Sequence, residues 1–269
     1  MKIIDYCPVC LSRNLEYQPV LIAPFVAFRI FGWAPTNFKW DEKDTDTFIA
    51  LPICKSMRCL EPDCGFYFSD IRYDDVEMGR LYTGYREEEY VAQRVTFEPN
   101  YAELNEELEH ETVPYYGVME EFILKSCPSR PKRVLDWGGG NGINTPIRDA
   151  EIHILDICTK PLHYGVLVSE PDPPYDLVVC SNTLEHVSYP RQFLRQIKSV
   201  MDKDTLLYLE VPIENQNFKA WHEHINKFTE KSTRKVLELA KLDIVDINLF
   251  PPPKHGYEGL LGVMCKLMA

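Results

Sequence analysis

Residues 133–147 read RVLDWGGGNGINTPI, and this stretch decides how the fold is interpreted. The chain has 13 glycines in 269 residues, yet four of them stand within the five residues 138–142. Directly before them come a short apolar segment over 134–137 and Asp136. Glycine lets a backbone turn sharply and lets a ligand approach without interference from a Cβ atom. A buried strand, a glycine turn and a short helix after it predict a loop that binds a nucleotide cofactor.

The spacing of the glycines and of two acids narrows the choice of cofactor. Gly138, Gly140 and Gly142 follow a Gly-x-Gly-x-Gly pattern, whereas NAD folds usually show Gly-x-Gly-x-x-Gly. Asp136 beside the turn suits a ligand with a cationic amino-acid end better than a diphosphate. Asp156 stands 20 positions after Asp136 at the end of the next predicted strand, where an acid accepts ribose hydroxyls. A tight turn without function would explain the glycines alone, but not this whole arrangement.

The region from 131 to 269 alternates between strand-like and helix-like segments. Strands are predicted over 134–137, 152–157, 165–170, 175–181 and 206–212, helices over 191–201 and 229–242, and two final strands in DIVDINLF and GLLGVMCKLM. Such alternation is typical of a doubly wound α/β sheet. Only 18 residues separate Ile157 from Asp176, so the helix before the third strand is very short or missing.

Four segments in this region resemble the class I S-adenosylmethionine-dependent methyltransferases. VLDWGGGNG resembles their first motif, IHILDI the strand whose acid binds the ribose, YDLVVCSNTLEHV the fourth strand and its turn, and MDKDTLLYLEVPIEN the fifth strand. The resemblance implies a Rossmann-like fold that binds S-adenosylmethionine. The residues it implies for cofactor binding are Asp136, Gly138, Gly140, Gly142, Asp156 and Asn182.

The region from 1 to 75 holds five of the nine cysteines and reads as small β elements and loops. Cys7-Pro-Val-Cys10 and Cys59-Leu-Glu-Pro-Asp-Cys64-Gly are paired cysteines at short spacing, which fits a tetrahedral thiolate site for structural Zn²⁺. Four thiolates would close the site to water, so we expect no chemistry there. Cys54 is a further candidate ligand in place of Cys59, and unpaired buried thiols are the alternative interpretation. Residues 76–130 carry helix formers at helical spacing and are expected to form a helical lid and linker.

Charge and cysteine use limit the partners and the compartment. The formal net charge is −12, which repels nucleic acid and anionic membrane surfaces. The N-terminus lacks the apolar core of a signal peptide, because Cys7 and Pro8 interrupt it. Many cysteines without an export signal favour a reducing compartment. The expectation is a cytoplasmic protein with a small-molecule substrate, whose oligomeric state, monomer or homodimer, stays open.

Histidines in two predicted loops are candidates for removing a proton from the molecule that accepts the methyl group. WHEHINKF resembles the Tyr-His-Glu-His motif of sugar C-methyltransferases, which His222, Glu223 and His224 match while Trp221 replaces the tyrosine. His186 follows the fourth strand. Histidine suits proton transfer because its pKa lies near neutrality. His224 is predicted to be the base, assisted by His186 and Glu223, with carbon and oxygen methylation both open. Alternatively, His186 caps a turn and His224 is an ordinary loop histidine.

The N-terminal cysteine pattern followed by LYTGY resembles bacterial methyltransferases of sugar and secondary-metabolite biosynthesis. Under this resemblance Tyr82, Tyr85, Tyr90 and Arg94 lie near the active-site mouth, although ordinary packing explains them as well. The expected function is methylation of a polar biosynthetic intermediate, an activated sugar being the favoured class. The rivals are a non-catalytic zinc-ribbon adaptor with a degenerate cofactor fold, a NAD-linked oxidoreductase and a methyltransferase of proteins.

Overall fold

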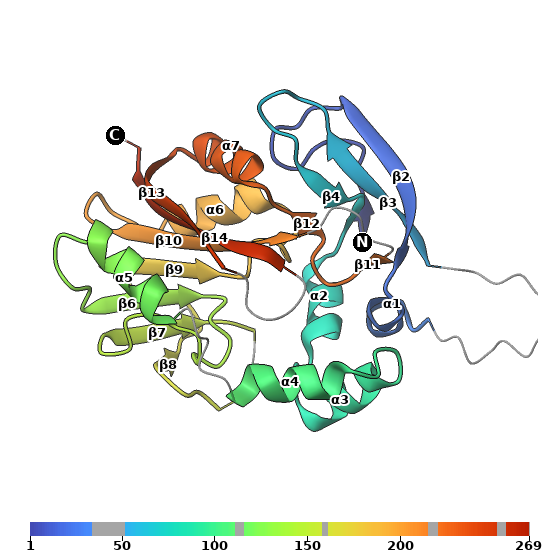
Figure 1. Ribbon diagram of the computed structural model, residues 1–269, viewed down its shortest axis with the longest axis horizontal. Helices are drawn as coiled ribbons and strands as arrows, with labels where there is room; N and C mark the ends of the chain where they lie inside the picture. The colour runs from blue at the N-terminus through green and yellow to red at the C-terminus, as the bar shows by residue number, and fades with distance from the viewer. Residues whose placement is uncertain (34–51, 111–115, 158–160, 215–219, 252–256, 269) are drawn as a thin grey trace, which may run out of the picture.

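The strand that precedes the glycine turn lies inside a seven-stranded sheet (Figure 1). The computed structural model describes residues 1–33, 52–110, 116–157, 161–214, 220–251 and 257–268. The strands of this sheet, in spatial order, are β13 (Leu242–Phe250), β14 (Tyr257–Leu267), β10 (Leu206–Glu214), β9 (Leu177–Ser181), β6 (Arg133–Trp137), β7 (Glu151–Leu155) and β8 (Val166–Leu167). Neighbours from β10 to β8 are parallel, and β14 is antiparallel to both β10 and β13. The predicted doubly wound α/β fold is confirmed.

The central strands are apolar throughout because both faces of the sheet are covered. Consecutive residues of one strand point to opposite faces of the sheet and pack in different cores. Leu135 packs with α6 (Pro190–Lys198) and α7 (Glu230–Ala240). Val134 packs with α5 (Tyr116–Ser126) on the other face. Figure 1 shows α6 and α7 on one side of the sheet and α5 on the other. The sheet therefore holds its carboxyl ends rigidly between two helical layers, and these ends carry the candidate site.

The helix predicted after the glycine turn is absent, and that prediction is wrong. Residues 138–150 are fully described and form only turns between β6 and β7. Pro146 lacks an N–H group, and Ile147 has a φ of 59°, which a helix cannot accommodate. The hydroxyl of Thr145 is bound to Asp136. The glycine loop therefore stands without a helix dipole behind it.

A second sheet lies beside the first and takes strands from both ends of the chain. Its order is β11 (Ala220–Trp221), β2 (Leu15–Ile22), β3 (Ile53–Cys59), β4 (Tyr67–Ser69) and β12 (Asn226–Lys227). β11 pairs in parallel with β2, and β12 pairs antiparallel with β4. A two-stranded pair of β1 (Lys2–Ile3) and β5 (Ile71–Arg72) accompanies it. The short segment between β11 and β12 is thus fixed at both ends by the N-terminal sheet.

The N-terminal region also contains a helix, where only small β elements and loops were expected. This helix, α1 (Pro24–Phe31), has proline at its first position and ends at Gly32, which has a φ of 69°. Phe25 and Ile30 are among the side chains that α1 buries. The sequence VLIAPFVAFRIFG carries both terminal signals, so the helix could have been predicted from it.

The described residues of the predicted helical region between 76 and 130 form four helices. They are α2 (Asp75–Tyr82), α3 (Glu88–Val95), α4 (Tyr101–His110) and α5. Asp74 and Glu77 form a capping box at the start of α2. Tyr90 packs edge-on against Phe25 of α1, with ring centroids 5.1 Å apart. In the part of the chain that the structure describes, no helix is both long and apolar enough to cross a membrane.

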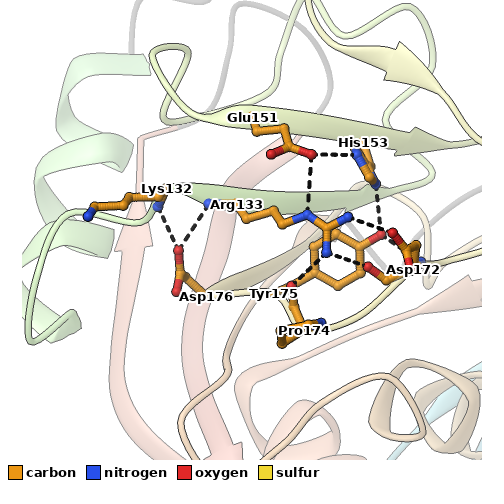
Figure 2. A network of polar contacts seen from close by, with 8 residues as sticks. All are labelled: Lys132, Arg133, Glu151, His153, Asp172, Pro174, Tyr175 and Asp176. Atoms are coloured by element: carbon orange, nitrogen blue, oxygen red, sulfur yellow. Dashed lines mark hydrogen bonds and ion pairs between the residues drawn. The ribbon is translucent and has the colours of Figure 1, made fainter.

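A polar network fastens the amino ends of three strands, opposite the candidate site (Figure 2). Arg133 donates to Glu151, to the Asp172 carboxylate and to the backbone oxygens of Asp172 and Pro174. The buried His153 lies between Glu151 and the Tyr175 hydroxyl, 3.0 and 2.9 Å away. These contacts give His153 a structural role and join β6, β7 and the segment that leads to β9.

Candidate active site

Three glycines of the loop have a positive φ, and the reasons for glycine differ between these positions. A Cβ on Gly138 would overlap the side chain of Thr183, and one on Gly142 would overlap the backbone of Tyr164. Gly140, with a φ of 58°, would meet nothing within 4 Å. Packing within the protein therefore explains Gly138 and Gly142. Gly140 instead borders open space, where a ligand can approach the backbone.

Two acids flank this loop at the carboxyl ends of β6 and β7. Asp136 is buried and accepts the Thr145 hydroxyl at 2.5 Å. Burial raises its pKa to about 7, and the charge of Asp156 acts in the same direction. Asp156 accepts the backbone N–H of Gly140 at 2.8 Å. The loop and both predicted acids therefore meet at one edge of the sheet.

Asn182 lies at the carboxyl end of the neighbouring strand β9. Its φ is 48°, its side-chain amide donates to Glu210 Oε1 at 3.0 Å, and its backbone N–H donates to the Glu210 carbonyl at 3.1 Å. Burial raises the pKa of Glu210 to about 7. These bonds fix the start of the turn that carries Glu185 and His186.

His186 and His224 come together although 38 positions separate them in the sequence. Their ring centroids lie 4.5 Å apart, with the rings nearly perpendicular. Glu185 Oε1 lies 3.8 Å from His186 Nε2, and Glu214 Oε2 lies 3.2 Å from His224 Nδ1. These four side chains come from the turn after β9, the end of β10 and the segment between β11 and β12. We refer to Glu185, His186, Glu214 and His224 as the histidine cluster.

The two imidazoles of the histidine cluster have opposite electrostatic surroundings. Burial, together with the charge of His224, lowers the pKa of His186 to about 3. Burial also opposes protonation of His224, but the hydrogen bond to Glu214 and the charges of Glu214, Glu185 and Glu223 outweigh it and raise the pKa to about 9. His186 is therefore neutral at neutral pH, whereas His224 carries a proton.

His186 is oriented by α2. The Tyr82 hydroxyl lies 2.7 Å from its Nδ1, and the backbone oxygen of Glu223 lies 3.2 Å from the same atom. Tyr82 and Tyr85 line a hollow of about 190 Å³ together with Ile157, which follows Asp156. The end of α2 thus contacts both the histidine cluster and the edge that carries the glycine loop.

The side chains of Glu223 and His222 interact with Arg94 and Glu98, respectively. Arg94 donates to both carboxylate oxygens of Glu223, at 2.9 and 3.3 Å. Burial opposes ionisation of Glu223, but the Arg94 charge outweighs it and lowers the pKa well below the usual range. His222 is half exposed and lies 3.5 Å from Glu98. Glu223 therefore acts on His224 through its permanent charge, and His222 faces another acid.

Glu185 is a member of the cluster that the sequence interpretation passed over. Its side chain is 1% exposed, and neither carboxylate oxygen has a hydrogen-bond partner among the described residues. Burial raises its pKa to about 7. An acid next to His186 within the apolar turn TLEHV was the available signal, because such an acid has no solvent to face.

The segment that carries His224 is held in place by Asn226, which is fully buried. Its side-chain amide donates to the backbone oxygens of Leu184 and Val187, at 3.2 and 2.7 Å. Its side-chain oxygen accepts from Arg72 of β5 at 2.8 Å. One side chain thereby joins the turn after β9, β12 and the N-terminal region.

Replacing Asn226 with alanine should lower the free energy of unfolding by about 3–5 kcal/mol, because it removes one acceptor of the buried Arg72 guanidinium and the donor to two backbone carbonyls. Urea unfolding followed by circular dichroism measures this. Asn248 of β13 is exposed, so Asn248→Ala should change stability by less than about 1 kcal/mol. A loss below about 1 kcal/mol in Asn226→Ala would contradict the role given to Asn226.

The four predicted metal-ligating cysteines converge at the end of the N-terminal sheet. The sulfurs of Cys7 and Cys64 lie 3.8 Å apart and those of Cys10 and Cys59 lie 3.5 Å apart, and all four lie within 4.8 Å of one another. A tetrahedron with Zn–S bonds of 2.3 Å has edges of about 3.8 Å. The donor set therefore fits Zn²⁺. Cys54 is buried in a different core and is not part of the group.

The family model described as "methyltransferase domain" matches residues 110–247, which is 138 of the 269 residues. Among curated proteins, no sequence matches this chain.

Among solved structures, the chain is similar to the Burkholderia thailandensis 1,6-didemethyltoxoflavin-N1-methyltransferase with bound 1,6-didemethyltoxoflavin and S-adenosylhomocysteine. That similarity has 19% identity, covers 78% of this chain and 98% of that chain, and has a TM-score of 0.51. An S-adenosylmethionine-dependent methyltransferase from Clostridium acetobutylicum ATCC 824 matches at 12% identity, over 64% of this chain and 99% of that chain, with a TM-score of 0.45. The first similarity indicates a shared fold.

Proposed function

Because the chain belongs to the methyltransferase domain family, we propose that it transfers the methyl group of S-adenosylmethionine to a small polar acceptor. The observation that carries the proposal is the meeting of the glycine loop, Asp136, Asp156 and the histidine cluster at the carboxyl ends of the parallel strands. Ligands of doubly wound sheets bind at this edge. The structurally similar Burkholderia enzyme has a small heterocycle bound, which supports a small acceptor.

The cofactor side of the proposal assigns a role to each group at the loop. Gly140 borders the space that the cofactor would occupy, and Gly138 and Gly142 give the loop its shape. Asp156 is proposed to bind the ribose hydroxyls and Asp136 to face the cationic amino-acid end. Asn182 is proposed to support the site from β9. Isothermal titration calorimetry with S-adenosylmethionine and S-adenosylhomocysteine tests the assignment, and a chain that binds neither would end it.

Replacing Gly140 with alanine should weaken binding of S-adenosylhomocysteine at least tenfold, because the added Cβ enters the proposed cofactor space. Gly32→Ala is the matched control: Gly32 also has a positive φ and open space around it, but it terminates α1. Both variants should lose about 1–2 kcal/mol of stability from the strained backbone. Calorimetry separates the two effects, and equal cofactor affinity in both variants would place the cofactor elsewhere.

The acceptor side of the proposal assigns the proton to His224. Bound S-adenosylmethionine supplies an electrophilic methyl group, and the acceptor forms its new bond to that carbon while the sulfur–carbon bond breaks. His224, whose Nδ1 faces Glu214, is proposed to take the acceptor's proton. Glu223 and Glu185 raise the basicity of His224, and His186, neutral and fixed by Tyr82, is proposed to orient the acceptor. His222 is proposed to contribute from the rim beside Glu98.

An activated sugar is the proposed acceptor class, with carbon and oxygen methylation equally open. Trp221 in place of the motif's tyrosine removes a hydroxyl, and Trp221 is buried in the N-terminal core. Incubating the protein with labelled S-adenosylmethionine and a panel of nucleotide-linked sugars and ketosugars tests this class. Transfer of label to none of them, but to a different class of small molecule, would reject the sugar and keep the enzyme.

The remaining proposals concern the organisation of the chain. Cys7, Cys10, Cys59 and Cys64 are proposed to hold a structural Zn²⁺ at the end of the N-terminal sheet. We propose a zinc module over 1–75, a lid and linker over 76–130 and the methyltransferase domain over 131–269, from which β11 and β12 extend into the module's sheet. The net charge of −12 supports the proposal that nucleic acid and membranes are not partners, and the many cysteines support the proposed cytoplasmic setting.

A further inference from the structure

A hollow lined by basic side chains lies between α6 and α7. Its volume is about 350 Å³. Arg191, Arg195 and Lys198 of α6 and Lys241 after α7 line it, and Leu239 and Ala240 form part of its wall. The two helices lie side by side on one face of the main sheet (Figure 1). This is a concentration of positive charge in a chain whose net charge is −12.

The hollow is distinct from the candidate active site. Lys198 ends α6 and Lys241 caps α7, and the strands that follow them, β10 and β13, begin there. These points belong to the amino ends of the two strands, whereas the glycine loop and the histidine cluster lie at the carboxyl ends. No residue that lines the hollow belongs to that site.

The cations of the hollow lack the acidic partners that neighbouring cations have. Among the described residues, no hydrogen bond or ion pair involves the side chains of Arg191, Arg195 or Lys241, and Arg191 Nε is shielded from solvent without an acceptor. On the outer face of α7, by contrast, Arg234 pairs with Glu230 at 2.7 Å and Lys235 with Glu238 at 3.1 Å.

The spacing along α6 keeps the cations together. Positions i, i+4 and i+7 lie on one face of a helix, so Arg191, Arg195 and Lys198 form a single stripe. Lys198 donates to the backbone oxygens of Ala240 and Lys241, at 3.2 Å each, which ties the end of the stripe to the end of α7. The guanidinium groups of Arg191 and Arg195 make no such bond among the described residues.

We propose that this hollow binds the phosphate groups of a small molecule, with Arg191 and Arg195 as the principal contacts. A planar guanidinium presents paired N–H donors that match two oxygens of a phosphate. A volume of about 350 Å³ lies in the range of small-molecule sites, about 300–1,000 Å³. The acidic surface elsewhere opposes nucleic acid and anionic membranes, which extend far beyond one hollow. The ligand class is a small phosphate or diphosphate, free or attached to an organic group.

Isothermal titration calorimetry of the full, zinc-loaded chain with inorganic pyrophosphate at low salt tests the proposal. We expect saturable binding to one site, weakened at least tenfold in Arg191→Gln/Arg195→Gln. The matched control Arg234→Gln/Lys235→Gln removes the same charge from the outer face of α7 and should keep the affinity within about twofold. Circular dichroism and zinc content, measured before and after titration, confirm that each protein is folded and metal-loaded.

Two further ligands identify the source of the phosphate. Tighter binding of ADP than of pyrophosphate indicates an organic diphosphate, and orthophosphate binding as tight as that of pyrophosphate indicates a single phosphate. Absence of saturable binding for all three ligands at millimolar concentration overturns the proposal. Equal weakening in the two double variants also overturns it, because the effect would then be one of net charge. The result does not depend on the methyltransferase reaction or on its acceptor.

Discussion

Exchanging His224 for glutamine should lower kcat by about 10²–10⁴-fold, the range that a positioned general base contributes. Glutamine keeps a polar side chain of similar reach but cannot accept the acceptor's proton. Binding of S-adenosylhomocysteine should stay within about threefold of wild type, because the residues proposed to bind the cofactor lie at the carboxyl ends of β6, β7 and β9. Single-turnover methyl transfer and calorimetry on the same preparations separate the two quantities. His222→Gln should lose less than about tenfold, because this imidazole is 54% exposed and lies against Glu98.

The pH dependence provides an independent check on the base. The pKa of His224 is raised to about 9, so the neutral, proton-accepting form becomes more abundant as the pH rises. For wild type, kcat/KM should therefore increase about tenfold per unit between pH 7 and 8 and level off near 9. A rise that levels off near pH 7 would instead point to Glu185, whose pKa is raised to about 7. Unchanged turnover in His224→Gln would remove His224 from the mechanism.

Replacing Cys64 with serine should abolish binding of the proposed zinc and, with it, much of the catalytic activity. A structural zinc site of this kind contributes about 10–16 kcal/mol of apparent binding energy at neutral pH. Its loss would loosen the sheet of β2, β3 and β4, on which β11 and β12 depend. Since His224 lies between β11 and β12, turnover should fall more than tenfold and Tm by about 10 °C or more.

Zinc content by mass spectrometry, together with activity and thermal unfolding, measures these effects. Cys54→Ser is the matched control, because Cys54 is buried in the same N-terminal region but lies outside the cysteine group. It should keep one zinc per chain and most of its activity. A Cys64→Ser protein that stays folded and active without zinc would show that the cysteine site does not support the segment that carries His224.

The main sheet could be predicted from the sequence because its strands carry strong local signals. Val134 and Leu135 belong to a buried apolar run, and the glycines that follow mark its end. A short helix was predicted after the glycine turn, and it is absent because Pro146 lacks an N–H group and Ile147 has a φ of 59°. A local backbone constraint there outweighed the general pattern.

The site itself could be predicted only in part. The sequence pointed separately to the turn with His186 and to the segment with His224, but the contact between their rings depends on tertiary packing. β11 and β12 have two residues each, too few to show a period of two, so their pairing with β2 and β4 left no sequence signal. Glu185 was missed because its environment, and not its residue type, makes it unusual.

The way β11 and β12 join the N-terminal sheet has a consequence for dissecting this protein. A fragment that starts at residue 116 would keep α5 and the whole main sheet but would lose β2 and β4, with which β11 and β12 pair. Its Asn226 would lack the hydrogen bond from Arg72, and β11 and β12, which flank His224, would have no strands to pair with. We therefore expect the truncation to reduce turnover more than cofactor binding, because the main sheet is retained while the support of the His224 segment is lost.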